Sequence, residues 1–345
     1  MREITVKKNQ ITMLAFAIIA LVILLGFVQQ TPASDNRVPL TIPQIVQAVA
    51  GTVVEIDTQN LIEGRTRPIM QPGAGSGVII SSNGYIVTNN HVIVGSDNNV
   101  VDSITVQLRD GTSFEAEVVG RDERTDLAVI RINATNLSVA RFGDSDELIV
   151  GELAIAIGNP LGNLGGTVTD GIISALNRDI NIDGEVMNLL QTSAAVNPGN
   201  SGGGLFNSYG ELIGIVNAKP MGHGIEGIGF AIPSNQVEFI SSQLIEHGFV
   251  VGRVALGITT VDISDAFTAI LFGVSQQGLY VYYSHPESGL LAGDRIIGVN
   301  GIAVRNRAQV RTIYLNYNVG DEIEITFIRS GETYRTNTIL IQATH

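Results

Sequence analysis

Short apolar runs separated by turn residues dominate residues 43–232. Gly, Asn and Asp stand between the runs, and closely spaced strands with such turns are typical of β-barrels and sandwiches. The runs are too numerous for one small barrel, so the pattern predicts a mainly β domain with two barrels. The clearest runs are Thr52–Ile56, Gly77–Ile80, Tyr85–Thr88, Ile104–Leu108, Leu127–Ile132 and Leu153–Ile157.

The period changes at the end of this β region. Val237, Ile240 and Leu244 recur at helical spacing, Ser234 is a candidate N-cap, and Gly248 stands where a C′ glycine is expected. One short helix therefore closes a domain that we assign to residues 43–248.

The C-terminal block, residues 249–345, returns to strands and forms a domain of its own. Its turns are predicted at Gly289–Gly293, Asn300–Gly301 and Ser330–Gly331. It has room for a single module of roughly a hundred residues.

The N-terminal segment has a different character. Ile11–Val28 carries no charge and would extend about 27 Å as a helix, close to the thickness of a bilayer core. Lys7 and Lys8 precede it, and the positive-inside rule then leaves residues 1–10 in the cytoplasm and everything after Gln30 outside. We expect a single-pass anchor at 11–29 followed by a linker at 30–42. A cleaved signal peptide is the alternative, although the apolar run is long and no A-x-A-like site follows it.

Composition narrows the function. The net charge of the chain is −13. The first 37 residues contain four basic and two acidic side chains, so the remainder has 16 basic against 31 acidic residues. Such an acidic body argues against nucleic-acid binding. The chain has no Cys, which excludes a thiol nucleophile, a disulfide and a Cys–zinc site. We expect no metal and no cofactor.

The sharpest chemical signal is a serine within a glycine-rich run, Asn197–Leu205 (NPGNSGGGL). Glycines on both sides of Ser201 allow a tight turn that points successive N–H groups into one concavity, as the oxyanion of an acyl-transfer intermediate requires. We place this oxyanion hole at Gly199, Asn200 and Ser201, with the N–H groups of Gly199 and Ser201 as donors. Taken alone, a Gly–Ser run could also be an ordinary turn.

A nucleophilic serine needs a base, and the base needs an orienting acid. His91 directly follows the predicted strand Tyr85–Thr88, and Asp126 lies at the entry to the apolar strand Leu127–Ile132. Either residue alone could be structural, but their order along the chain with Ser201 predicts a catalytic triad. His223, His247, His285 and His345 are interpreted as surface or structural residues.

Several strings resemble the HtrA/Deg family of trypsin-like serine proteases. They run through nearly all of residues 43–236, and they are residues 75–93 (GSGVIISSNGYIVTNNHVI), 124–132 (RTDLAVIRI), 151–162 (GELAIAIGNPLG), 166–178 (GTVTDGIISALNR), 191–205 (QTSAAVNPGNSGGGL) and 227–236 (GIGFAIPSNQ). The C-terminal block resembles a PDZ domain through Leu256–Ile258 (LGI), residues 285–301 (HPESGLLAGDRIIGVNG) and residues 319–325 (VGDEIEI).

This resemblance implies two six-stranded barrels with the triad between them, followed by one PDZ domain. One anchor, one protease domain and one PDZ domain are most similar to the DegS-type members, which sense unfolded envelope proteins and cut a regulatory membrane protein; the family also implies a homotrimer. Two residues depart from the family pattern: Ser193 stands where Asp is usual, and Gly204 where Pro is usual. Neither belongs to the triad.

Two positions bear on specificity and activation. By similarity, Ala195 lies at the base of the specificity pocket, to which we also assign Ile228. A methyl group cannot pair with Lys or Arg, so small or medium aliphatic side chains are expected before the cleaved bond. Asn200 cannot form the ion pair that an Asp makes with a freed N-terminus in digestive relatives, which favours activation by loop ordering over trimming.

The PDZ block is expected to bind C-terminal peptides of misfolded envelope proteins by strand addition, with Ala255, Leu256, Gly257 and Ile258 around the terminal carboxylate. A packing domain without a ligand is the alternative. For the whole chain we expect a regulated serine endopeptidase acting on protein substrates. The alternatives are an inactive chaperone or PDZ adaptor, and a structural binding module, which would leave the GNSGG run unexplained.

Overall fold

The computed structural model describes residues 37–62, 69–95, 99–158, 167–182, 185–197, 199–218, 227–284, 288–314 and 316–344. The chain divides into a unit at Met1–Pro39 and a unit at Leu40–His345. In the described ranges no helix is long and apolar enough to cross a bilayer. The predicted anchor at 11–29 lies outside them.

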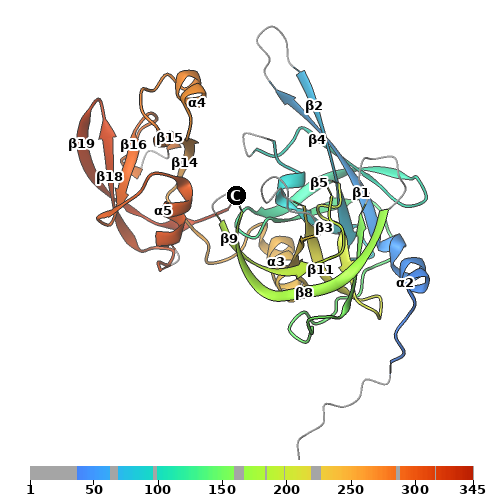
Figure 1. The fold of residues 1–345 in the computed structure, drawn as a ribbon. Coiled ribbons are helices and arrows are strands. Elements are labelled where there is room, and N and C mark those ends of the chain that lie inside the picture. Colours follow the sequence, from blue (N-terminus) through green and yellow to red (C-terminus); the bar gives the residue numbers. More distant parts are fainter. Residues whose placement is uncertain are drawn as a thin grey trace, which may run out of the picture. The chain divides into compact units, whose positions relative to one another are not determined.

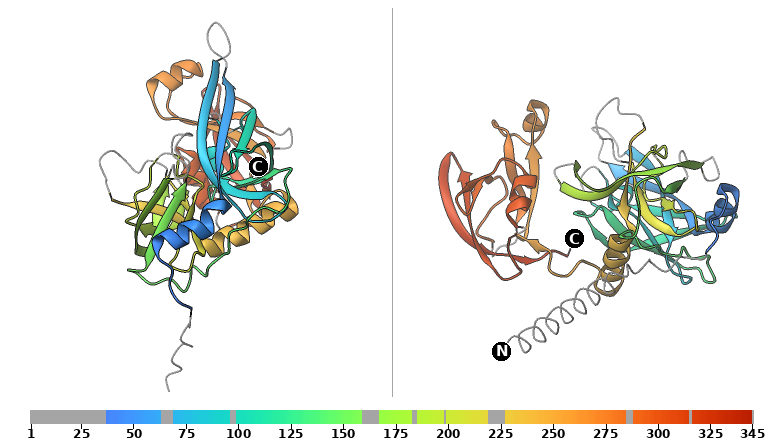
Figure 2. Two further views of the ribbon diagram at one scale, coloured as in Figure 1. Left: turned by 90° about the vertical axis from the view of Figure 1, so that its right-hand side faces the viewer. Right: turned by 60° about the horizontal axis from the view of Figure 1, so that its bottom comes forward.

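The first barrel is a closed, antiparallel sheet in the order β1-β2-β3-β6-β5-β4 (Figure 1). Alternate side chains of its strands fill the interior, where Ile56, Ile86 and Ile130 are fully buried. The paired strands β1 and β2 extend as a long hairpin beyond the rest of this barrel, as both Figures 1 and 2 show. The strands are β1 (Val53–Ile62), β2 (Ile69–Ile79), β3 (Tyr85–Asn89), β4 (Ser103–Gln107), β5 (Ser113–Asp122) and β6 (Leu127–Ile132).

The second barrel is closed in the order β10-β11-β12-β9-β8-β7. Its strands are unequal, because β8 runs for 16 residues whereas β10 has only 3. The long pair β8 and β9 curves round one side of the barrel (Figure 1). The strands are β7 (Leu153–Gly158), β8 (Thr167–Ile182), β9 (Glu185–Thr192), β10 (Gly204–Phe206), β11 (Leu212–Asn217) and β12 (Gly229–Pro233). The predicted pair of six-stranded barrels is therefore confirmed.

A shared apolar core joins the two barrels. It combines strand residues of both with Val237, Ile240 and Leu244 of helix α3 (Ser234–His247). Gly248 ends this helix in the left-handed conformation, as the sequence predicts. The predicted N-cap is wrong by one residue: Pro233 occupies that position, and the Ser234 hydroxyl donates to Gly143 O instead.

Helix α2 (Ile42–Val49) is an element that the strand pattern did not predict. Thr41 and Gln44 form a capping box at its start, and Ile45 and Val49 are buried in the shared core. The ordered domain thus begins just inside the segment that we expected to be linker, since the N–H of Leu40 already donates to Ser208 O.

The C-terminal domain has a sheet in the order β14-β15-β16-β18-β19, with β17 paired to β16, and a separate β13–β20 pair. Its core contains Leu279, Val299, Ile325 and Leu340, all fully or nearly fully buried. The mainly β fold expected for this block is confirmed. Its elements are β13 (Val254–Ala255), β14 (Ile258–Ile263), α4 (Ala266–Leu271), β15 (Gly278–Ser284), β16 (Arg295–Val299), β17 (Ile302–Ala303), α5 (Arg307–Tyr314), β18 (Glu322–Arg329), β19 (Glu332–Ile339) and β20 (Ile341–Gln342).

Candidate active site

Three polar side chains meet in one hydrogen-bonded line where the barrels face each other. His91 Nδ1 lies 2.7 Å from Asp126 Oδ2, and His91 Nε2 lies 3.0 Å from Ser201 Oγ. Asp126 is 2% exposed and Ser201 6%. An ionised carboxylate only accepts hydrogen bonds, so Nδ1 carries the imidazole proton and Nε2 is left to accept the proton of the serine hydroxyl.

The first barrel supplies both His91 and Asp126 from the ends of paired strands. His91 lies in a 3-10 turn, Asn90–Val92, directly after β3, and Asp126 directly precedes β6. The register of β3 and β6 pairs Asn89 with Leu127, which brings the two strand ends together. The sequence separates these residues, and the sheet makes them neighbours.

Asp126 is held by more than the imidazole. Its backbone is left-handed, with φ of 54°, a conformation that is uncommon outside glycine and best tolerated by Asn and Asp. Its Oδ1 accepts the His91 N–H at 3.0 Å, and its carbonyl accepts the N–H of Asn90 and the side-chain amide of Asn89. Asp126 is therefore fixed against the imidazole by residues 89–91, the segment that carries His91.

Asn217 is a site residue that the sequence did not reveal. Its Nδ2 donates to Asp126 Oδ2 at 2.9 Å from the end of β11 in the second barrel. Asn217 is 3% exposed, so this bond lies out of water and links the barrels at the triad. The sequence signal that could have indicated Asn217 is that it is the single polar residue at the end of the otherwise apolar run LIGIVN.

The glycines after Ser201 are required by close backbone approach. Gly202 has φ of +83°, and a Cβ there would overlap with Ser76 O and Thr88 Oγ1. On Gly203 a Cβ would overlap with Ile157 O. The serine loop therefore lies directly on both barrels, which leaves no room for a side chain after the nucleophile.

Asn200 lies within the predicted oxyanion hole but was not assigned as a donor. Its N–H donates to Asn197 O at 3.0 Å and so belongs to a turn. Gly199 has φ of +98°, and its carbonyl accepts a hydrogen bond from the Ser76 hydroxyl. The candidate donors remain the N–H groups of Gly199 and Ser201.

A cleft of about 330 Å³ opens beside the hydrogen-bonded line. It contains both His91 and Ser201, so a bound chain could reach the serine. Its lining combines the root of the β1–β2 hairpin with the His91 turn and the serine loop: Thr58, Asn60, Gln71, Pro72, Gly73, Ala74, His91, Val92, Val94, Gly95, Val101, Gly199, Ser201 and Ala218.

Neither residue of the predicted specificity pocket lines this cleft. Ala195 is exposed, and its carbonyl accepts a hydrogen bond from Thr169 Oγ1, while Ile228 is 45% exposed. The two departures from the family pattern fit their surroundings. Ser193 Oγ accepts the N–H of Ile172, and a Cβ at Gly204 would overlap with the ring of Phe206.

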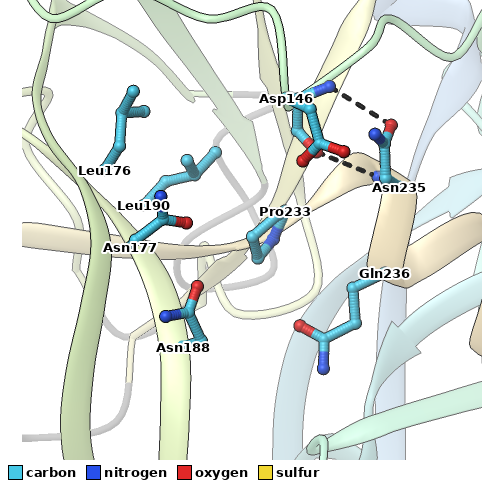
Figure 3. Close-up of a pocket in the computed structure, with 9 residues that line it drawn as sticks. Asp146, Leu176, Asn177, Asn188, Leu190, Pro233, Asn235 and Gln236 are labelled. Carbon is cyan, nitrogen blue, oxygen red and sulfur yellow. Dashed lines mark hydrogen bonds between the residues drawn. The ribbon is translucent and has the colours of Figure 1, made fainter.

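A larger hollow of about 440 Å³ lies elsewhere on the second barrel, with Leu176 and Leu190 on one side and Asn235 on the other (Figure 3). Asn235 Oδ1 accepts the Ser145 N–H, and the Asn235 N–H is bonded to Ser145 Oγ, so this amide fixes the loop to the start of α3. None of the triad residues lines it. Asn235 and Ser145 thus have a structural role in this hollow.

In the C-terminal domain, the predicted peptide-binding residues form the turn from β13 into β14. Gly257 has φ of +67°, Leu256 is buried in the domain core, and Ile258 begins β14. Strand β14 lies at the edge of its sheet and, among the described residues, pairs only with β15. An edge strand that follows a glycine turn is the arrangement that peptide addition requires.

Of the other histidines, only His247 belongs to the described residues. It lies at the end of α3, 3.8 Å from a carboxylate oxygen of Glu246, which agrees with a surface role. His223, His285 and His345 lie outside the described ranges.

Two six-stranded barrels with a Ser–His–Asp line between them define the class of trypsin-like serine peptidases. The family model of the trypsin-like peptidase domain matches residues 75–215, and that of the PDZ domain matches residues 254–340. The chain belongs to the HtrA family of trypsin-like serine proteases with one PDZ domain.

Solved and curated relatives agree with this assignment. The structure of an HtrA-type protease, AlgW, with a decapeptide is 32% identical, has a TM-score of 0.56, and aligns over 88% of this chain and 98% of that one. The "Probable periplasmic serine protease do/HhoA-like" of Haemophilus influenzae is 47% identical over 76% of this chain and 57% of its own length. The "Periplasmic serine endoprotease DegP" of Escherichia coli is 44% identical over 78% of this chain and 57% of its own. The chain thus spans less than two thirds of the curated relatives' length.

Proposed function

We propose that this protein is a serine endopeptidase in which Ser201 is the nucleophile, His91 the general base and Asp126 the orienting acid. Ser201 Oγ attacks the carbonyl carbon of the scissile peptide, and its proton passes to His91 Nε2. The imidazolium, stabilised by Asp126, then gives that proton to the leaving amine as the C–N bond breaks. A water molecule then attacks the acyl-enzyme, and His91 accepts its proton. His91 returns this proton to Ser201 Oγ as the acyl group is released.

The tetrahedral intermediate requires donors for its oxyanion, and we assign the N–H groups of Gly199 and Ser201. Backbone donors are fixed before the reaction begins, and removing one such donor typically costs about 2.7–4 kcal/mol of transition-state stabilisation. The positive φ of Gly199 and the bond between its carbonyl and Ser76 support this assignment.

The observation that carries the proposal is the pair of contacts at 2.7 and 3.0 Å that joins Asp126, His91 and Ser201. A fluorophosphonate probe added to the detergent-solubilised protein should label wild type and leave Ser201→Ala unlabelled. Cleavage of an unfolded protein should disappear in the same variant. Labelling without cleavage of any unfolded protein or peptide would support the alternative of an inactive chaperone or adaptor.

For substrate specificity, we propose small or medium aliphatic side chains before the scissile bond, with Ala195 and Ile228 at the pocket. No charge is offered at Ala195 to pair with Lys or Arg, and each methylene difference changes binding by only about 1–3 kcal/mol. Peptide libraries should show broad cleavage after Val, Ala, Leu and Ile. A preference for Arg would mean that the pocket is assigned wrongly.

For location, we propose a single-pass inner-membrane protein with an extracytoplasmic catalytic domain. The uncharged segment 11–28 behind Lys7 and Lys8 supports the anchor, and the names of two curated relatives describe periplasmic proteases. The protein should fractionate with inner membranes and resist alkaline extraction. A soluble chain beginning near residues 31–36 would identify a cleaved signal peptide instead.

We further propose a DegS-type role, in which the PDZ domain binds protein C-termini at Ala255–Ile258 and so controls proteolysis within a homotrimer. The open edge of β14 and the peptide complexes among the solved relatives support peptide binding. A bound peptide should raise the cleavage rate saturably, by about 5–150-fold for typical couplings. Sedimentation of the solubilised protein tests the trimer. If no peptide that binds changes the cleavage rate, the PDZ domain only delivers substrate.

A further inference from the structure

Helix α5 borders the open edge of β14, and its first residue reaches that edge directly. The N–H of Arg307 donates to Asp262 Oδ1 at 2.9 Å, and Arg307 Nη2 donates to the backbone carbonyl of Thr260. Both acceptors belong to β14. The guanidinium therefore occupies a backbone acceptor on the strand to which a peptide would add.

Helical spacing gives Arg307 a second basic neighbour. Arg307 and Arg311 are one turn apart, whereas Val310 and Ile313 of the same helix are buried in the domain core. Arg311 thus lies on the same side of α5 as Arg307, which contacts β14. Asp262, committed to the start of the helix, offsets part of their charge.

In this structure the two guanidinium groups already hold a carboxylate. Arg311 Nη2 lies 2.7 Å from Glu123 Oε2, and Arg307 Nη1 lies 3.4 Å from Glu123 Oε1. Burial alone would raise the pKa of Glu123, but Arg311 and Arg307 outweigh it and hold the pKa below its usual value. In addition, Arg307 Nε is buried and makes no hydrogen bond within the described structure.

The position of this pair along β14 follows from strand geometry. A peptide whose terminal carboxylate lies at the Gly257 turn would run antiparallel to β14, with its last residue opposite Ile258 and its third-from-last residue opposite Thr260. The N–H of that residue would take over Thr260 O and release Arg307 Nη2. Because side chains alternate along a strand, the next-to-last residue points away.

We propose that the edge of β14 selects C-terminal peptides with Glu or Asp as the third residue from the end, and that Arg307 and Arg311 bind this carboxylate in place of Glu123. The inference rests on the proposed peptide binding by the PDZ domain and specifies its ligand. Guanidinium groups bind carboxylates through strong, directional charge-assisted hydrogen bonds. The C-terminal carboxylate itself stays at the Gly257 turn.

The test uses the solubilised full chain carrying Ser201→Ala, which leaves the peptides uncut. Four fluorescent decapeptides share one sequence except at their ends: Glu-Ala-Val, Gln-Ala-Val, Ala-Glu-Val, and Glu-Ala-Val as a C-terminal amide. Fluorescence anisotropy should show that Glu-Ala-Val binds about tenfold more tightly than Gln-Ala-Val and Ala-Glu-Val. The amide should bind far more weakly than any free acid.

Substitutions then locate the effect. Arg307→Gln should make Glu-Ala-Val bind like Gln-Ala-Val, whose unchanged affinity reports a folded PDZ domain. Arg305→Gln, the same change at an exposed arginine before the helix, should leave the tenfold preference intact. Glu123→Gln should tighten binding of Glu-Ala-Val alone, since it removes the internal carboxylate.

The outcomes separate the two proposals. If all three free-acid peptides bind alike and the amide does not bind, C-terminal recognition stands and acidic selection is wrong. If amidation has no effect, or no peptide binds, the proposed peptide-binding function fails and acidic selection fails with it. A preference for Glu-Ala-Val that survives Arg307→Gln would also overturn the assignment.

Discussion

The cleft of the proposed triad and helix α5 of the PDZ domain both have a carboxylate beside a nitrogen cation or base, but in opposite surroundings. Asp126 is 2% exposed, and its partners include the buried amides of Asn89 and Asn217. The side chains of Glu123, Arg307 and Arg311 are each about 30% exposed. Buried hydrogen bonds fix one geometry because their loss leaves buried polar groups without a hydrogen-bond partner, water included. The partly exposed ion pairs have water as an alternative partner, and this suits a site that must exchange its ligand.

Substitutions in the proposed triad are expected to have the largest effect on cleavage. Asp126→Asn should lower kcat about ten thousandfold, because the amide cannot hold the imidazole in the required tautomer. His91→Ala and Ser201→Ala should abolish cleavage with losses that do not add. Cleavage assays with circular dichroism as the folding check measure this. Asp146→Asn, at an exposed aspartate, is the control, and a near-wild-type rate in any triad variant would refute the assignment.

The next largest effect is expected at Gly202, the glycine that follows Ser201. Gly202→Ala should lower the unfolding free energy of the protease domain by roughly 2–4 kcal/mol, because backbone strain is added to overlap with Ser76 and Thr88. Gly111→Ala is a matched control: its φ is +85°, but nothing lies within 4 Å of the added Cβ. That change should cost only about 1–2 kcal/mol. Equal shifts in thermal unfolding would show that conformation alone, and not close packing, requires Gly202.

A smaller effect is expected at Asn217. Asn217→Ala should lower kcat roughly 10–100-fold with little change in KM, since a lost hydrogen bond worth about 1.5–3 kcal/mol loosens Asp126 and leaves substrate contacts in place. Asn188→Ala removes the same group from an amide that bonds to Asp179 on the barrel surface, and should leave kcat unchanged. A rise in KM without a fall in kcat would contradict a positioning role.

The smallest effect on stability is expected at Arg311 in α5. Arg311→Gln should change the unfolding free energy by less than about 1 kcal/mol, because partly exposed ion pairs contribute little. Raising the salt concentration should leave the cleavage rate of a short unstructured peptide almost unchanged. Chemical unfolding measures the change in stability, and initial rates measure the effect of salt on cleavage. A loss above about 2 kcal/mol would place Arg311 among the fixed contacts and remove the contrast between the two sites.

Local pattern was sufficient for much of the fold. Leu127–Ile132 forms β6 with the predicted bounds, and Ser234–His247 forms the predicted helix, because alternation and helical spacing record which side chains must be buried. Strand β2 was predicted only from Gly77, yet it begins at Ile69. The polar, glycine-containing segment before Gly77 becomes a strand because it pairs with β1, for example Ala74 with Asp57.

The sequence by itself determined the chemistry: a serine among glycines, one histidine after a strand and one aspartate before another, in the order of a known family. Tertiary structure decided which groups hold them. Asn217 reaches Asp126 across 91 positions of the chain, and Arg307 reaches Thr260 across 47. Such contacts leave no periodic trace, because hydrophobic spacing reports burial along one element, whereas a hydrogen bond between elements depends on how the elements pack.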